Sequence, residues 1–221
     1  MTIQHIFYIP TIFLLGFVFG TLVNKKEAIT SNSIEKSSQK NLFKTKTSKN
    51  KLIQTFLIFL LVFIATHMFE LPWSSKAISH LIGDLEIFDK RPVFSSAEVY
   101  KKLSLFSEEA LITYKRFTYT IDIIFPLSLF TFLFTFARFI SQRITIPNYI
   151  ATVLIGLPFF WFAFDLIENA VIFNILSKFP TQSEFLAGSL GFITVIKFGL
   201  LLLSIFTPSL LFIFIQKSEE D

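Results

Sequence analysis

The chain has 221 residues, of which 52% are hydrophobic and only 16% are charged, a balance far more apolar than that of an ordinary soluble domain. Cysteine is absent, which excludes a disulfide scaffold and a thiol nucleophile. The formal net charge is +4, but basic charge indicates a nucleic-acid partner only where Lys and Arg cluster on a soluble face. Composition therefore predicts a membrane protein with no nucleic-acid partner.

Five stretches are long and apolar enough to cross a hydrocarbon core, which takes about 20 helical residues. They cover residues 6–23, 52–69, 117–137, 149–176 and 190–215. We interpret the first as a retained anchor, because no Lys or Arg precedes it and no signal-peptidase-like site follows Gly20. The predicted fold is an all-α integral membrane protein with about five transmembrane helices.

These spans predict the domain organisation. Residues 1–23 form an N-terminal anchor, and residues 24–51 form a flexible basic cytosolic linker, rich in Ser, Thr, Asn and Lys, with too few apolar residues to build a core. A four-helix transmembrane bundle occupies residues 52–216, and an acidic tail follows at 217–221. Within the bundle unit, residues 70–116 are expected to form a short amphipathic segment outside the membrane.

The positions of Lys and Arg predict the orientation, because these residues accumulate in cytoplasmic loops. The linker holds eight Lys against two Glu, and Arg138 and Arg143 flank the turn after the third predicted span. The 70–116 segment carries seven basic and seven acidic residues, so it does not oppose this orientation. We expect a bacterial cytoplasmic (inner) membrane protein with its N-terminus outside and its C-terminus inside.

Local signals mark a helix partner and two helix starts. Gly16 and Gly20 form a G-x-x-x-G pair, a spacing that lets a second helix approach closely, although one such pair also arises by chance. The lipid bilayer is the other expected partner. Ser95 and Glu98 have the spacing of a capping box. A second helix start at Ser107 is expected to run on into the third span.

Ionisable residues inside the spans are the candidates for function, because charge at membrane depth is costly and usually faces a protein interior or water. Four residues qualify: Asp122, Asp165, Glu168 and Lys197. At about 1.5 Å of rise per helical residue, all four lie roughly 8–12 Å below the predicted outer ends. Three spans therefore carry charge at a similar level in their outer halves.

Helical spacing adds further members to this candidate cluster. Asn169 shares a helix face with Asp165, and Tyr119 lies three residues before Asp122. Pro126 cannot donate a hydrogen bond to the carbonyl of Asp122, which leaves that oxygen available. Three residues are expected at the outer rim: His67, Glu70 and Arg116.

Three acids and one Lys cannot all stay ionised in a poor dielectric without compensation. We interpret the chain chiefly as a non-enzymatic membrane component whose polar cluster organises the bundle or a partner interface. A proton or cation relay remains open, although the inner halves of the spans carry no ionisable residue. So does an enzyme acting on a lipid or envelope precursor at the outer leaflet, with a divalent metal held by the acids, His67 or Glu70.

The enzyme hypothesis lacks a recognisable motif. Neither H-E-x-x-H nor G-x-S-x-G occurs. Catalytic residues are therefore left unassigned, and neither a cofactor nor a metal is predicted.

Two short motifs resemble those of a loose group of uncharacterised bacterial multi-pass membrane proteins. The first is Y-x-x-D-x-x-F-P, here Tyr119, Asp122, Phe125 and Pro126. The second is D-L-x-E-N, here Asp165, Leu166, Glu168 and Asn169. The similarity covers about residues 52–215. It implies a helical bundle with these polar positions near one another, and it implies neither a reaction nor a substrate.

Overall fold

The structure, a computed structural model, describes residues 46–72, 74–83 and 85–220. The predicted anchor with Gly16 and Gly20, and most of the linker, lie outside the described residues. Within them, all regular secondary structure is helical, which confirms the all-α prediction. The elements are α3 (Lys49–Met68), α4 (Ser75–Ile82), the 3₁₀ helix η1 (Phe88–Lys90), α5 (Ser96–Leu103), α6 (Glu108–Thr118), α7 (Ile121–Ser141), α8 (Asn148–Lys178) and α9 (Glu184–Glu220).

Four helical stretches in the described part are long and apolar enough to cross a membrane: α3, α6 together with α7, α8, and α9. They correspond to the last four predicted spans. α3 begins at Lys49, where Ser48 accepts a hydrogen bond from the backbone N–H of Lys51. Residues 49–51 were expected in the linker but are helical.

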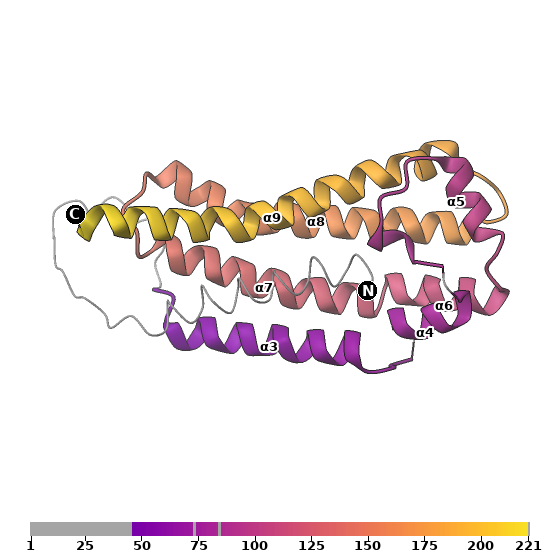
Figure 1. Cartoon of the computed structure of the whole chain (residues 1–221), viewed down its shortest axis with the longest axis horizontal. Helices are drawn as coiled ribbons and strands as arrows, with labels where there is room; N and C mark the ends of the chain where they lie inside the picture. Colours follow the sequence, from indigo (N-terminus) through magenta and orange to yellow (C-terminus); the bar gives the residue numbers. More distant parts are fainter. Residues whose placement is uncertain (1–45, 73, 84, 221) are drawn as a thin grey trace.

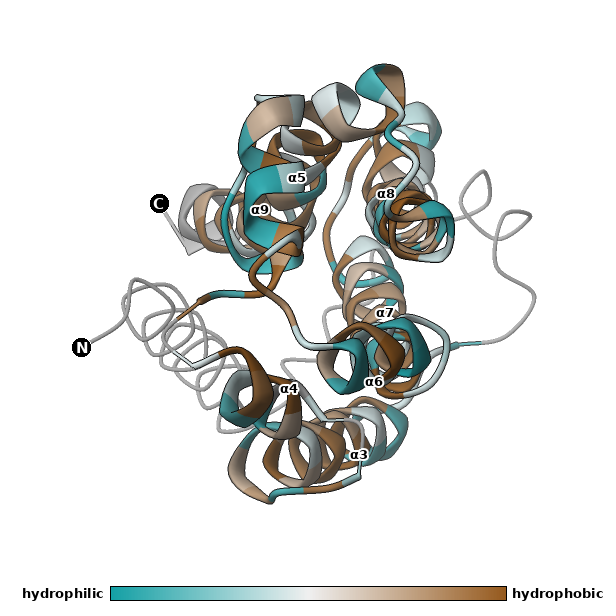
Figure 2. Cartoon of the chain, turned by 90° about the vertical axis from the view of Figure 1, so that its right-hand side faces the viewer, coloured by the Kyte–Doolittle hydropathy of each residue, from teal (hydrophilic) through white to brown (hydrophobic). Residues whose placement is uncertain are grey.

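α3, α7, α8 and α9 run side by side along the length of the molecule (Figure 1). α8 and α9 share the most extensive contact, and α7 packs against α3, α8 and α9. Residues 70–107, here called the capping segment, carry α4, η1 and α5 and cover one end of the bundle, as the end-on view shows (Figure 2). We call this end the capped end.

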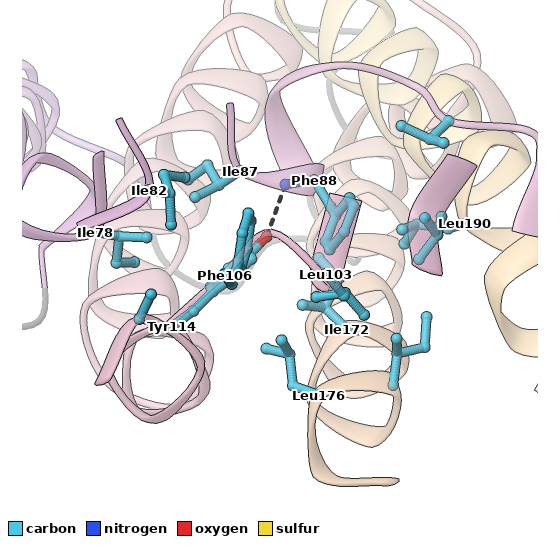
Figure 3. Close-up of a cluster of buried hydrophobic side chains, with 14 of the residues drawn as sticks. Ile78, Ile82, Ile87, Phe88, Leu103, Phe106, Tyr114, Ile172, Leu176 and Leu190 are labelled. Atoms are coloured by element: carbon cyan, nitrogen blue, oxygen red, sulfur yellow. Dashed lines mark hydrogen bonds between the residues drawn. The ribbon is translucent and has the colours of Figure 1, made fainter. Parts of the chain in front are cut away.

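The capping segment shares a hydrophobic core with α6, α8 and α9. Phe88 of η1 stacks on Tyr114 of α6, with 6.0 Å between ring centroids, and its backbone N–H donates to the Tyr114 hydroxyl at 2.7 Å (Figure 3). Side chains of α8 and α9, including Ile172 and Leu190, complete this core. The segment is therefore packed onto the bundle rather than lying loosely on its surface.

Two predicted helix starts are confirmed, and the predicted continuation of the second helix into the third span is interrupted by a two-residue turn. Ser95 accepts from the N–H of Glu98, and Ser107 from that of Ala110. The second helix does not run unbroken into the third span, because α6 ends at Thr118 and α7 begins at Ile121. The Thr118 hydroxyl bonds to a backbone carbonyl of its own turn, a local bond that competes with regular helix.

A second, aromatic core fills the rest of the bundle. Phe59 of α3 stacks on Phe132 of α7, with 5.9 Å between ring centroids, and Trp161 of α8 is buried in the same cluster. The buried hydrophobic residues of this cluster extend along α7 as far as Ile140. The two cores meet near the capped end, where the candidate polar residues lie.

Candidate functional site

An ion pair buried between α8 and α9 forms the centre of the site. The Lys197 ammonium of α9 contacts a carboxylate oxygen of Glu168 on α8. Thr194, one turn earlier on α9, donates its hydroxyl to the other Glu168 oxygen. Glu168 has no exposed surface and Lys197 is 7% exposed. Both oxygens of this carboxylate therefore have partners, as a buried charge requires.

Asp165 extends this arrangement by one helical turn. Its Oδ1 lies 3.5 Å from the Lys197 ammonium. Its Oδ2 is buried and has no hydrogen-bond partner. One ammonium thus serves two carboxylates, and the second carboxylate is only half satisfied.

The backbone carbonyl of Asp122, to which Pro126 cannot donate, accepts a hydrogen bond from another helix. Asn169 of α8 donates its side-chain N–H to the backbone oxygen of Asp122 at 2.8 Å. The bond joins α8 to the first turn of α7. The carbonyl oxygen that Pro126 leaves without a helical donor is therefore used in a contact between α7 and α8.

A cavity of about 70 Å³ lies beside the ion pair, between α3, η1, α7, α8 and α9. It has room for several water molecules, since one water molecule needs about 10–15 Å³ of such free volume. Its polar lining consists of Thr66, His67, Asp89, Lys90, Asp122, Asp165 and Lys197. Three of the four predicted intramembrane ionisable residues therefore face one cavity, and the fourth, Glu168, is paired just behind it.

Asp89 is a site residue that the sequence reasoning missed. It belongs to η1, and its Oδ1 is buried without a hydrogen-bond partner. Burial raises the pKa of the Asp89 carboxyl, against the opposing effect of the Lys197 and Lys90 charges. The sequence signal that could have found it is the apolar pair Ile87 and Phe88 directly before it. Both side chains are buried, and their packing places η1 against the bundle.

His67 is the predicted rim residue that reaches the cavity. Its Nδ1 lies 2.9 Å from the Thr66 hydroxyl oxygen, and its ring stacks on that of Phe63 with 4.6 Å between centroids. Glu70 does not join it. Glu70 instead faces His80 at 3.7 Å, and both side chains are more than half exposed.

Two other predicted members also lie elsewhere. Tyr119 is 52% exposed and packs edge-on against Phe173, with 5.9 Å between ring centroids. Arg116 is exposed on α6 and does not line the cavity. The prediction that Tyr119 joins the polar cluster is wrong, because the break between α6 and α7 removes the helical spacing on which it rested.

Within the described part of the chain, no group of three or more His, Asp or Glu residues has the geometry to hold a metal ion. Comparisons with protein-family models, curated proteins and solved structures find no match to this chain.

Proposed function

We propose that the chain is a non-enzymatic, multi-pass component of a membrane, whose polar cluster organises the helix bundle and its capped end. The observation that carries this proposal is the buried Lys197–Glu168 ion pair, completed by Thr194. Helices in lipid gain little from the hydrophobic effect between them, so interhelical hydrogen bonds and ion pairs contribute to their pairing. This ion pair joins α8 to α9, the two helices with the most extensive contact.

Two features support this role over an enzyme or a relay. Thr66 supplies the aliphatic hydroxyl in the cavity lining, and the partners of this hydroxyl belong to its own helix α3, the nearest being the Val62 carbonyl oxygen at 2.8 Å and His67 Nδ1 at 2.9 Å. On the other side of the cavity, the aromatic core of Phe59, Phe132 and Phe136 fills the bundle. A proton or cation relay would need ionisable groups or water along that path.

We further propose five spans in a bacterial inner membrane, with the capped end outside. The end of α7 supports this orientation, because Thr47 donates its backbone N–H to the Gln142 side chain at 2.7 Å. That contact brings Lys46 and the start of α3, with Lys49 and Lys51, to the same end as Arg138 and Arg143. Basic residues from two loops gather there, as expected for a cytoplasmic face.

Reporter fusions test this topology. A fusion after Lys40 should give a cytoplasmic signal, and a fusion after Glu98 a periplasmic one. The opposite pair of signals would reverse the orientation. Two signals from the same side would remove α3 from the set of membrane spans.

The organising role is tested with a variant that keeps the shape of the ion pair and removes its charge. We expect a protein with both Glu168→Gln and Lys197→Met to complement a deletion strain, provided that this double variant is folded. A matched variant, Lys178→Met, changes an exposed Lys near the end of α8 and controls for altered charge. A folded double variant that fails to complement, beside a complementing control, would contradict the organising role and favour chemistry at the cluster.

A further inference from the structure

The cavity carries more negative charge than its own lysines balance. Its charged lining consists of three acids and two lysines: Asp89, Asp122, Asp165, Lys90 and Lys197. Lys197 is also shared with Glu168, which lies behind the lining. Four acids thus meet two lysines, leaving two formal negative charges uncompensated. In a poor dielectric such a surplus calls for protons or a bound cation.

Two carboxylate oxygens on side chains that line this cavity are buried without a hydrogen-bond partner. They are Asp89 Oδ1, from the capping segment, and Asp165 Oδ2, from α8. The Asp165 side chain is 8% exposed, so bulk water does not satisfy it. A buried polar atom without a partner costs about 1–3 kcal/mol, and more when it is charged. The two oxygens therefore point to a ligand other than the protein's own donors.

We propose that this cavity binds a small, partly hydrated monovalent cation through Asp89 Oδ1 and Asp165 Oδ2. Its volume of about 70 Å³ accommodates an ion together with a few water molecules. A divalent ion fits less well, because the ammonium groups of Lys90 and Lys197 in the lining repel its higher charge more strongly. Three His, Asp or Glu side chains do not converge for direct coordination within the described residues, and two lysines border the cavity.

The bound cation would connect parts of the chain that are far apart in sequence. Asp89 belongs to the capping segment and Asp165 to the membrane helix α8, so one ion between them fastens the cap to the bundle. This goes beyond the organising role of the Lys197–Glu168 pair and does not require it, since that pair leaves the two oxygens unsatisfied. The capped end would then be more stable in the presence of the ion.

A tryptophan in the cavity wall offers a direct readout. The chain has two Trp residues, and Trp161 lines the cavity and is buried, so a Trp73→Phe background leaves Trp161 as the sole reporter. The full chain in detergent micelles is titrated with NaCl, KCl or NH₄Cl. N-methyl-D-glucamine chloride, whose cation is too large for the cavity, keeps the ionic strength constant, and the pH is fixed.

We expect at least one small cation to change Trp161 fluorescence saturably and to raise the thermal midpoint in parallel, because a ligand that binds the folded state stabilises it. Asp89→Asn should raise the apparent dissociation constant at least tenfold. Glu98→Gln, which alters an exposed acid of the same segment, should leave it unchanged. Asp165→Asn is the second variant, and it should behave as Asp89→Asn does.

Three results would overturn the cation site. One is the same fluorescence and midpoint for every cation, including N-methyl-D-glucamine. Another is an undiminished response in the Asp89→Asn protein, which keeps the Lys197 pair and so is expected to fold. The third is a fluorescence and midpoint that change when the whole titration is repeated at a second fixed pH, with no selectivity among cations, which would assign protons to these carboxylates instead.

Discussion

Replacing Lys197 with Met is expected to destabilise the folded protein severely and to lower its yield. The ammonium is buried and serves the carboxylates of Glu168 and Asp165, so its removal leaves two acids in the core without their cation. Breaking a buried pair on one side costs about 3–5 kcal/mol, a large share of a typical stability of about 5–15 kcal/mol. The monodisperse yield in detergent and the thermal midpoint measure this loss.

The partner substitution separates the lost pairing from a general loss of packing. Adding Glu168→Gln to Lys197→Met removes one stranded carboxylate while keeping its volume, so part of the stability should return. Lys178→Met changes an exposed lysine and should leave the free energy of unfolding within about 0.5 kcal/mol of the wild-type value. A Lys197→Met protein as stable as wild type would mean that the ion pair does not organise the bundle.

The part of the site on the long helices α7, α8 and α9 could be predicted because helical geometry fixes it. Asp165, Glu168 and Asn169 follow one another at helical spacing within α8, so any single helix brings them to one face. Lys197 lies at a matching depth on α9, and the polar groups of adjacent antiparallel helices meet where depths agree. The free carbonyl of Asp122 followed from proline chemistry alone. These inferences needed only the helix repeat and the span ends.

The part of the site that the capping segment contributes, Asp89, could not be predicted in this way. Asp89 enters the cavity through the packing of Phe88 against Tyr114, a contact between residues 26 positions apart that no local pattern encodes. Tyr119 failed for the opposite reason. Its spacing to Asp122 has meaning only in a continuous helix, and the chain breaks between them. Irregular segments are placed by tertiary contacts, which a periodic pattern does not describe.

Substituting Gly191 with Ala is the second change for which we expect a large effect, and it acts on the cap. A Cβ atom built at Gly191 of α9 would lie 2.7 Å from the Val93 carbonyl oxygen and 2.8 Å from its carbon. These are backbone atoms of the capping segment, so relief requires the chain there to move. Overpacking of this kind costs about 1–3 kcal/mol. The same helix offers a matched control at Gly188, where an added Cβ meets nothing within 4 Å.

Gly191→Ala should therefore lower the thermal midpoint and expose the capping segment to trypsin, with faster cleavage after Lys90. Gly188→Ala should show the wild-type cleavage rate. Its free energy of unfolding should rise by up to about 1 kcal/mol, because Ala has a higher helix propensity than Gly. The Lys197–Glu168 pair lies further along α9, so the bundle should remain intact while its cap loosens. Equal cleavage rates in the two variants would indicate that the capping segment does not depend on close approach to α9.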